Sequence, residues 1–205
     1  MKSKPGEGTL LASVVMSSPG AIVVGIAFFI GRSSTQLADF IRRTIELISI
    51  IVSWLVFRFL NKNQDLDSSQ KDKLEHTTNL FVGAAMFISG IVMIFIALFS
   101  SISGKGNVIP GLVIAVLGVT TNSWFWLRYR NLNSKNPDAI LAVQSKLYCA
   151  KTMVDACVMI SLAFIAIAPN ASMTQYVDLV GSIIVAIYLI INGIISICGR
   201  KDILS

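Results

Sequence analysis

Four charged side chains lie close together in the first half of a largely apolar stretch of the chain, residues 36–60. They are Asp39, Arg42, Arg43 and Glu46, and a helix would place them within about a 100° arc, on one face. A charge near the centre of a membrane-spanning helix costs about 2.5–3.5 kcal/mol, so such a face is tolerated only against protein or a wet cavity. Carboxylates in that setting are able to carry a proton or bind a cation.

A second apolar stretch, residues 139–168, repeats this arrangement. Lys151 stands four positions before Asp155, as Arg42 stands four positions before Glu46. At 1.5 Å per residue, Glu46 lies about 15 Å from the start of the first stretch and Asp155 about 20 Å from the end of the second. Similar motifs at matching depth on two helices are typical of the central site of a secondary transporter. We therefore expect these four side chains to form one central site.

The composition that surrounds these residues is that of an integral membrane protein. Hydrophobic residues make up 54% of the 205 residues and charged residues 14%, and the mean hydropathy is +0.73. A soluble domain of this length is far less apolar. The net charge of +6 does not indicate nucleic-acid binding, because the basic residues flank apolar runs, where they act as topology signals.

Six apolar stretches are long enough to cross a membrane, and we expect one all-α transmembrane domain over residues 1–205. The first stretch, residues 9–31, is too long for a signal peptide and has no clear cleavage site after it. We expect no soluble domain at either end. The expected spans are residues 10–31, 36–60, 78–101, 107–128, 139–168 and 175–198.

Lys and Arg residues are divided unequally between the two ends of these spans. One end holds only Arg32 and Lys105. The positive-inside rule then predicts that both termini and the connection 61–76 are cytoplasmic, in a multi-pass protein of the plasma (inner) membrane. The basic end holds Lys2, Lys4, Arg58, Lys62, Lys71, Lys73, Arg128, Arg130, Lys135, Arg200 and Lys201.

Residues suited to enzymatic chemistry are scarce. His76 is the one histidine of the chain, and no Ser or Cys stands at a suggestive spacing from it. Cys149, Cys157 and Cys198 lie in or beside apolar stretches without metal-ligand spacing, so we interpret them as small apolar side chains. We therefore expect no enzyme, no catalytic residue and no bound cofactor.

Four short elements resemble, in this order, motifs of one transporter family. GRSSTQLAD at 31–39 resembles its entry to the second helix, and KLEH at 73–76 is similar to an element before its third helix. Asn122 with the basic cluster after it is similar to the end of the fourth helix, and Asp178 before the last span is similar to the start of the sixth. The chain therefore resembles the cation diffusion facilitator family over nearly its whole length.

The resemblance implies a six-helix bundle that works as a homodimer in the lipid bilayer. It also implies that a divalent cation, such as zinc or manganese, is exchanged for protons, so that the metal is a transported substrate and not a cofactor. The family's cytoplasmic metal-binding domain is not expected in this chain.

The family's metal ligands are only half retained. They are His/Asp-x-x-x-Asp on the second helix and His-x-x-x-Asp on the fifth, and these positions read Arg42-x-x-x-Glu46 and Lys151-x-x-x-Asp155 here. Glu46 and Asp155 are the remaining candidate metal ligands. A guanidinium has no lone pair to donate, and an ammonium has one only after deprotonation, so the usual four-ligand site cannot form.

Three interpretations of the central site remain open. In the first, Glu46 and Asp155 of a divergent cation/proton exchanger carry the ions, and Arg42 and Lys151 occupy these carboxylates when substrate is absent. In the second, the protein has lost transport, and Arg42–Asp155 and Lys151–Glu46 ion pairs hold the bundle together. In the third, the excess of positive charge binds an anion or a zwitterion. The expected secondary pathway residues are Asp39 and Asp178, nearer the outer mouth, and Arg43.

Overall fold

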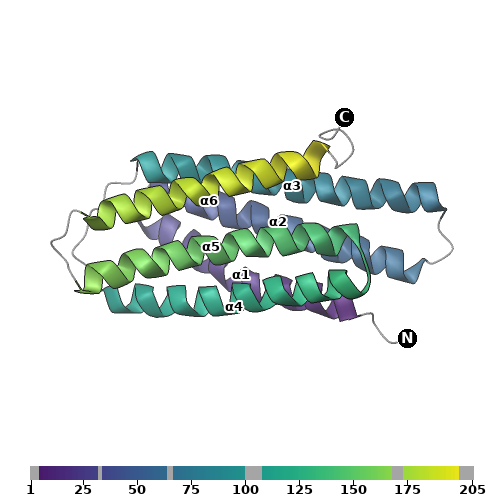
Figure 1. The fold of residues 1–205 in the computed structure, drawn as a ribbon, viewed down its shortest axis with the longest axis horizontal. Helices are drawn as coiled ribbons and strands as arrows, with labels where there is room; N and C mark the ends of the chain where they lie inside the picture. The colour runs from purple at the N-terminus through teal and green to yellow at the C-terminus, as the bar shows by residue number, and fades with distance from the viewer. Residues whose placement is uncertain (1–4, 32–33, 64–66, 100–107, 168–172, 199–205) are drawn as a thin grey trace.

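The described part of the chain folds, in a computed structural model, into a bundle of six α-helices without a strand (Figure 1). The structure describes residues 5–31, 34–63, 67–99, 108–167 and 173–198. The all-helical fold expected from the apolar stretches is confirmed. The helices are α1 (Pro5–Gly31), α2 (Ser34–Lys62), α3 (Ser68–Phe99), α4 (Val108–Lys135), α5 (Ala139–Ile167) and α6 (Met173–Cys198).

Four of the described helices are long and apolar enough to cross a membrane by length and composition alone. Over their described residues, α4 and α5 are not among them, and α5 contains the embedded Lys151 and Asp155. The count of six spans and the cytoplasmic termini therefore stay predictions. The four apolar segments are Gly6–Ile26, Phe40–Lys62, Ser68–Leu98 and Leu179–Cys198.

A short turn joins α4 to α5 and makes them an antiparallel hairpin. Oδ1 of Asp138 accepts hydrogen bonds from the backbone N–H groups of Ile140 at 2.9 Å and Leu141 at 3.2 Å, which caps the start of α5. The backbone N–H of Asp138 donates to Oδ1 of Asn133 at 3.0 Å. Because the turn is fixed in this way, α4 and α5 lie side by side along their length.

Glycines bring α3 and α6 into close contact. A Cβ atom built on Gly83 would lie 2.9 Å from the carbonyl oxygen of Gly193, and one built on Gly193 would lie 2.8 Å from the carbonyl oxygen of Gly83. Gly90 meets α6 in the same manner, because its Cβ would lie 2.9 Å from the carbonyl oxygen of Ala186. Small residues at such positions let helix backbones approach closely, which is typical of packing between membrane helices.

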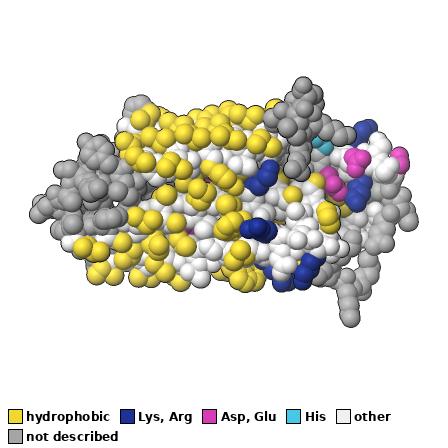
Figure 2. Space-filling view, viewed as in Figure 1, with side chains coloured by type: hydrophobic (Ala, Val, Ile, Leu, Met, Phe, Trp, Pro, Cys, Tyr) yellow, Lys and Arg dark blue, Asp and Glu magenta, His cyan; other side chains and the backbone are white. Residues whose placement is uncertain are grey.

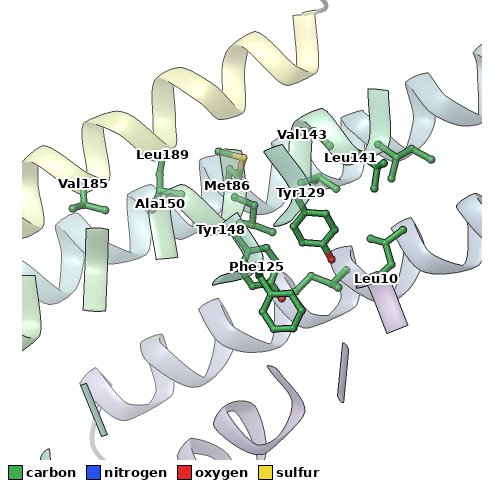
Figure 3. Close-up of a cluster of buried hydrophobic side chains, with 14 of the residues drawn as sticks. Leu10, Met86, Phe125, Tyr129, Leu141, Val143, Tyr148, Ala150, Val185 and Leu189 are labelled. Carbon is green, nitrogen blue, oxygen red and sulfur yellow. The ribbon is translucent and has the colours of Figure 1, made fainter. Parts of the chain in front are cut away.

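Part of the fully buried core lies toward the end of the bundle that carries both termini. Leu10 near the start of α1, Tyr129 near the end of α4 and Tyr148 in the first half of α5 are fully buried and gather there (Figures 1 and 3). Figure 2 shows hydrophobic side chains over much of the length of the bundle, whereas Lys, Arg, Asp and Glu side chains gather toward the same end as the termini.

Candidate functional site

One face of α2 turns a row of polar side chains into the bundle. Arg42 and Glu46 are only 6% and 3% exposed, and Ser49 and Ser53 continue the row at helical spacing. The two serines satisfy their hydroxyl groups locally, since they donate to the carbonyl oxygens of Glu46 at 2.7 Å and of Ser49 at 2.8 Å. Gln144 of α5 then donates through Nε2 to Oγ of Ser53 at 2.8 Å. Arg42 and Glu46 of the expected charged face are thus buried inside the bundle.

Glu46 is held between two cations from different helices. Its Oε1 lies 3.4 Å from Nη1 of Arg42, one turn earlier on α2, and its Oε2 lies 3.5 Å from Nζ of Lys151 on α5. The Lys151 side chain is 14% exposed and its Nζ lies 5.0 Å from the centre of the Tyr148 ring. This ion pair and the Gln144–Ser53 hydrogen bond are two polar links between α2 and α5.

Asp155 has a different environment, made chiefly by α4. Nδ2 of Asn122 donates a hydrogen bond to Oδ2 of Asp155 at 2.6 Å. One turn before Asn122, Gly118 leaves room for the carboxylate, because a Cβ at that position would lie 2.5 Å from Oδ2. Arg42 thus pairs with Glu46, whereas Asp155 accepts a hydrogen bond from Asn122.

A cavity of about 860 Å³ joins the two carboxylates. Its wall includes all four side chains expected at the central site, together with Arg43, which the sequence placed on the secondary pathway. Arg43 reaches α1, since a Cβ on Gly20 would lie 3.3 Å from its Nη1. The side chains of Asp39 and Asp178, the other two pathway residues, lie outside the described residues. Apolar side chains complete the wall, among them Met16, Val24, Met93, Ile114, Leu117 and Val158.

The family model for the cation efflux transmembrane domain matches residues 10–197, almost the whole chain. The chain belongs to the cation efflux family. This confirms the resemblance to cation diffusion facilitators, and with the apolar helices it makes the protein a multi-pass integral membrane protein and a cation transporter of that kind. No curated protein matches the sequence significantly.

An aromatic cluster of this cation efflux protein lies on α4 and α5, beginning about one turn from the cavity residues Asn122 and Lys151. The rings of Phe125, Tyr129 and Tyr148 lie 5.1–6.2 Å apart by their centres (Figure 3). The hydroxyl of Tyr129 donates to Oγ of Ser13 at 2.7 Å, and the hydroxyl of Tyr148 lies 3.0 Å from Oγ of Ser17. These bonds tie α1 to the α4–α5 hairpin just beside the cavity.

The described residues offer no clustered set of metal ligands. No three His, Cys, Asp or Glu side chains among them lie close enough together to hold a metal ion. The donors in the cavity that are able to bind a cation are Glu46, whose two oxygens face cations, and the Asp155–Asn122 pair. A cation that entered would therefore have to displace Lys151 or bind at Asp155.

Sequence reasoning missed the contribution of α4 to this site. Asn122 entered only through the family resemblance, and Gly118 was expected only to let helix backbones pack closely. Their four-residue spacing places both on one face of α4, and this was the available signal. It does not reveal that the face is turned toward Asp155 on the next helix.

Proposed function

We propose that this cation efflux protein is a secondary transporter that exchanges a cation for protons through the cavity between α2 and α5. Glu46 and Asp155 carry the ions, and Lys151 is a resident competitor that occupies Glu46 while no substrate is bound. The observation that carries the proposal is the Lys151–Glu46 ion pair at 3.5 Å on the wall of an 860 Å³ cavity. A purely structural pair needs no such space beside it.

The lengths of the two ion pairs support an exchangeable arrangement. Strong charge-assisted hydrogen bonds between nitrogen and oxygen are about 2.7–2.9 Å long. The contacts of Glu46 with Arg42 and Lys151 are 3.4 and 3.5 Å. The long, flexible side chain of Lys151 is able to leave Glu46 and stay near the ring of Tyr148 while a cation takes its place.

The aromatic cluster supports alternating access to this site. Hydrogen bonds between Tyr129 and Ser13 and between Tyr148 and Ser17 hold α1 against the α4–α5 hairpin. A rocking motion that breaks them would separate these helices beside the cavity, as expected for a secondary transporter with its site near the middle of the bundle.

Transport into proteoliposomes tests the proposal. We expect the purified protein to take up at least one of Zn²⁺, Mn²⁺ and Fe²⁺, each offered separately, only when a pH gradient is present. Glu46→Gln and Asp155→Asn should each lower the uptake at least about tenfold. Glu75→Gln is the matched control, because Glu75 is a carboxylate that pairs with Lys71 away from the cavity. Uptake at the parent rate in both cavity variants would contradict the proposal.

The buried charges favour a second candidate, a structural or regulatory protein. In it, the ion pairs of Glu46 with Arg42 and Lys151 hold the helix bundle together. The side chains of Arg42 and Glu46 are 8% and 4% exposed, so removal of one partner should cost about 3–5 kcal/mol. Arg42→Ala should then melt well below the parent in detergent, and the parent should bind none of the three metals. An Arg42→Ala protein as stable as the parent would exclude this candidate.

A further inference from the structure

The cavity has more room and more apolar surface than a metal ion uses. Its volume is about 860 Å³, and pockets of about 300–1,000 Å³ with mostly apolar walls are typical of sites for small organic molecules. Among the described residues, no three metal-ligating side chains lie together. The apolar part of the wall comes from α1, α3, α4 and α5, for example Val24, Met93, Ile96, Leu117, Val154 and Val158.

The cavity is open on the side of the bundle, between α1 and α4. Met16 of α1 and Ile114 and Leu117 of α4 all line it, and these residues are 56%, 70% and 61% exposed. Met16 lies near the middle of Gly6–Ile26, a segment that is long and apolar enough to cross a membrane. An opening at this depth faces the hydrocarbon of the bilayer. It suits a molecule that dissolves in the bilayer, which a metal ion does not.

Lys151 shows how this cavity holds an alkylammonium group. Its Nζ lies 3.5 Å from Oε2 of Glu46 and 5.0 Å from the centre of the Tyr148 ring. A carboxylate beside an aromatic face is a favourable environment for an ammonium ion. Asp155 lies one turn later on the same face of α5, and its hydrogen bond from the neutral amide of Asn122 does not cancel its charge. This second carboxylate is therefore able to bind the ammonium group of a ligand.

The positive charges of the wall favour a ligand with a single charge. Arg42, Arg43 and Lys151 line the cavity together with the carboxylates of Glu46 and Asp155. A divalent metal ion would add two more positive charges and depends on carboxylates for which the resident cations compete. An ammonium ion adds one charge, and an apolar body attached to it gains from burial whatever the charge of the wall.

We propose that the cavity binds an organic ammonium ion with an apolar alkyl or aryl body, which enters from the bilayer between α1 and α4. The ammonium group pairs with Asp155, and the body lies against the apolar wall. This rests on the transport function proposed above and adds a substrate class to the metal ions considered there.

Equilibrium dialysis against the protein in nanodiscs tests the binding without any transport. The ligand is 4-phenylbutylamine, which is protonated at neutral pH, and 4-phenylbutanol is its uncharged counterpart. Binding to empty nanodiscs is subtracted from each. We expect the amine to bind at least about tenfold more tightly than the alcohol, because it pairs with a carboxylate. Asp155→Asn should lose this preference, whereas Glu75→Gln, which removes a carboxylate away from the cavity, should keep it.

Chain length and two tryptophan variants test whether the apolar body lies in the cavity. From propylamine to hexylamine, each added methylene should tighten binding to the protein by about fourfold. Ile114→Trp places a larger side chain at the opening and should weaken binding of 4-phenylbutylamine at least about fivefold. Val113→Trp is the matched control, because Val113 is also exposed, at 53%, and is not among the described residues of the wall.

Four results would overturn the proposal. They are equal binding of the amine and the alcohol, which indicates an apolar pocket for lipid; no binding above that of empty nanodiscs; a preference for the amine that survives in Asp155→Asn; and equal binding by the two tryptophan variants. The last does not depend on whether Asp155→Asn folds.

The transport proposal fails separately. Metal uptake by a protein that binds no amine rejects only the ammonium site. Amine binding as expected, in a protein that takes up neither the amine nor a metal ion, supports the site and rejects transport.

Discussion

Two side chains, Arg42 and Lys151, set this chain apart from the metal site that its family resemblance implies. Together they bring two positive charges to the place where a divalent cation would lie, and both contact Glu46. Their charge is fixed in the protein and does not dissociate as a metal would. The resident cations are therefore the reason to expect a changed or more selective substrate.

Restoring ligands at these two positions should restore metal binding. Arg42→Asp combined with Lys151→His would give the cavity one imidazole and three carboxylates, a set that suits tetrahedral Zn²⁺. We expect the double variant to bind Zn²⁺ at least about a hundredfold more tightly than the parent in calorimetric titrations. Lys151→His alone should gain much less, because Arg42 still neutralises Glu46. Equal affinities of the parent and the double variant would show that the cations do not block the site.

For single residues, the sequence predicted which charged side chains lie together, because their charge and their depth in the helices decide this. Charges inside apolar stretches must face protein or a cavity, so Arg42, Glu46, Lys151 and Asp155 were predictable as one group. The Lys151–Glu46 ion pair was among the expected contacts, whereas Asn122 was not expected as the partner of Asp155. Whether Asp155 meets Arg42 or Asn122 depends on the rotation of α4 and α5 about their axes, which packing along the whole hairpin determines.

Among the helices, the close contact of α3 with α6 rests on glycine. We expect Gly83→Ala to destabilise the protein by about 1–3 kcal/mol, because the new Cβ would lie 2.9 Å from the carbonyl oxygen of Gly193 and from Cβ of Ser196. Gly8→Ala is the matched control, since a Cβ there meets nothing within 4 Å. It should keep or raise the melting temperature in detergent, because alanine favours helix. Similar melting temperatures for the two variants would contradict the close packing.

The polar start of α3 allows a pH-dependent test, because Glu75 precedes the span expected from residue 78. Burial raises the pKa of Glu75 above its ordinary value, Asp138 adds to this, and Lys71 opposes it. A raised pKa means that the folded state binds the proton more tightly than the unfolded state. The free energy of unfolding therefore falls as the pH rises from the pKa of Glu75 in the unfolded state through its higher pKa in the folded state.

Replacement of Glu75 by Gln should remove this loss. We expect Glu75→Gln to be slightly more stable than the parent near pH 7 and equally stable below pH 4 or so, where both states of the parent are protonated. Melting temperatures across this range provide the measurement. A parent that gains stability relative to Glu75→Gln as the pH rises would contradict the environment described for Glu75.

Over the whole molecule, hydrophobic side chains cover much of the length of the bundle, and charged side chains gather toward one end (Figure 2). The charged end holds the termini and the connection from α2 to α3, in agreement with a cytoplasmic location by the positive-inside rule. The sequence could predict this division because it depends on composition. It could not predict which of the apolar side chains are fully buried, since that depends on how the helices pack.

Cysteine labelling in intact cells tests the orientation. In a background with the native cysteines replaced by serine, Ile167→Cys should react with a membrane-impermeant maleimide, because residue 167 is 83% exposed at the end opposite the termini. Asp67→Cys, which is exposed at the charged end, should react only after the membrane is permeabilised. The opposite pattern would invert the proposed topology.

Proton movement measured against cation movement tests the central claim most directly. Proteoliposomes that contain a pH-sensitive dye are exposed to whichever of Zn²⁺, Mn²⁺ and Fe²⁺ the parent transports. The parent and Glu75→Gln should release protons in proportion to the cation taken up, whereas Asp155→Asn should release none. Proton release at the parent rate from Asp155→Asn, or cation uptake by the parent without any proton release, would contradict the account.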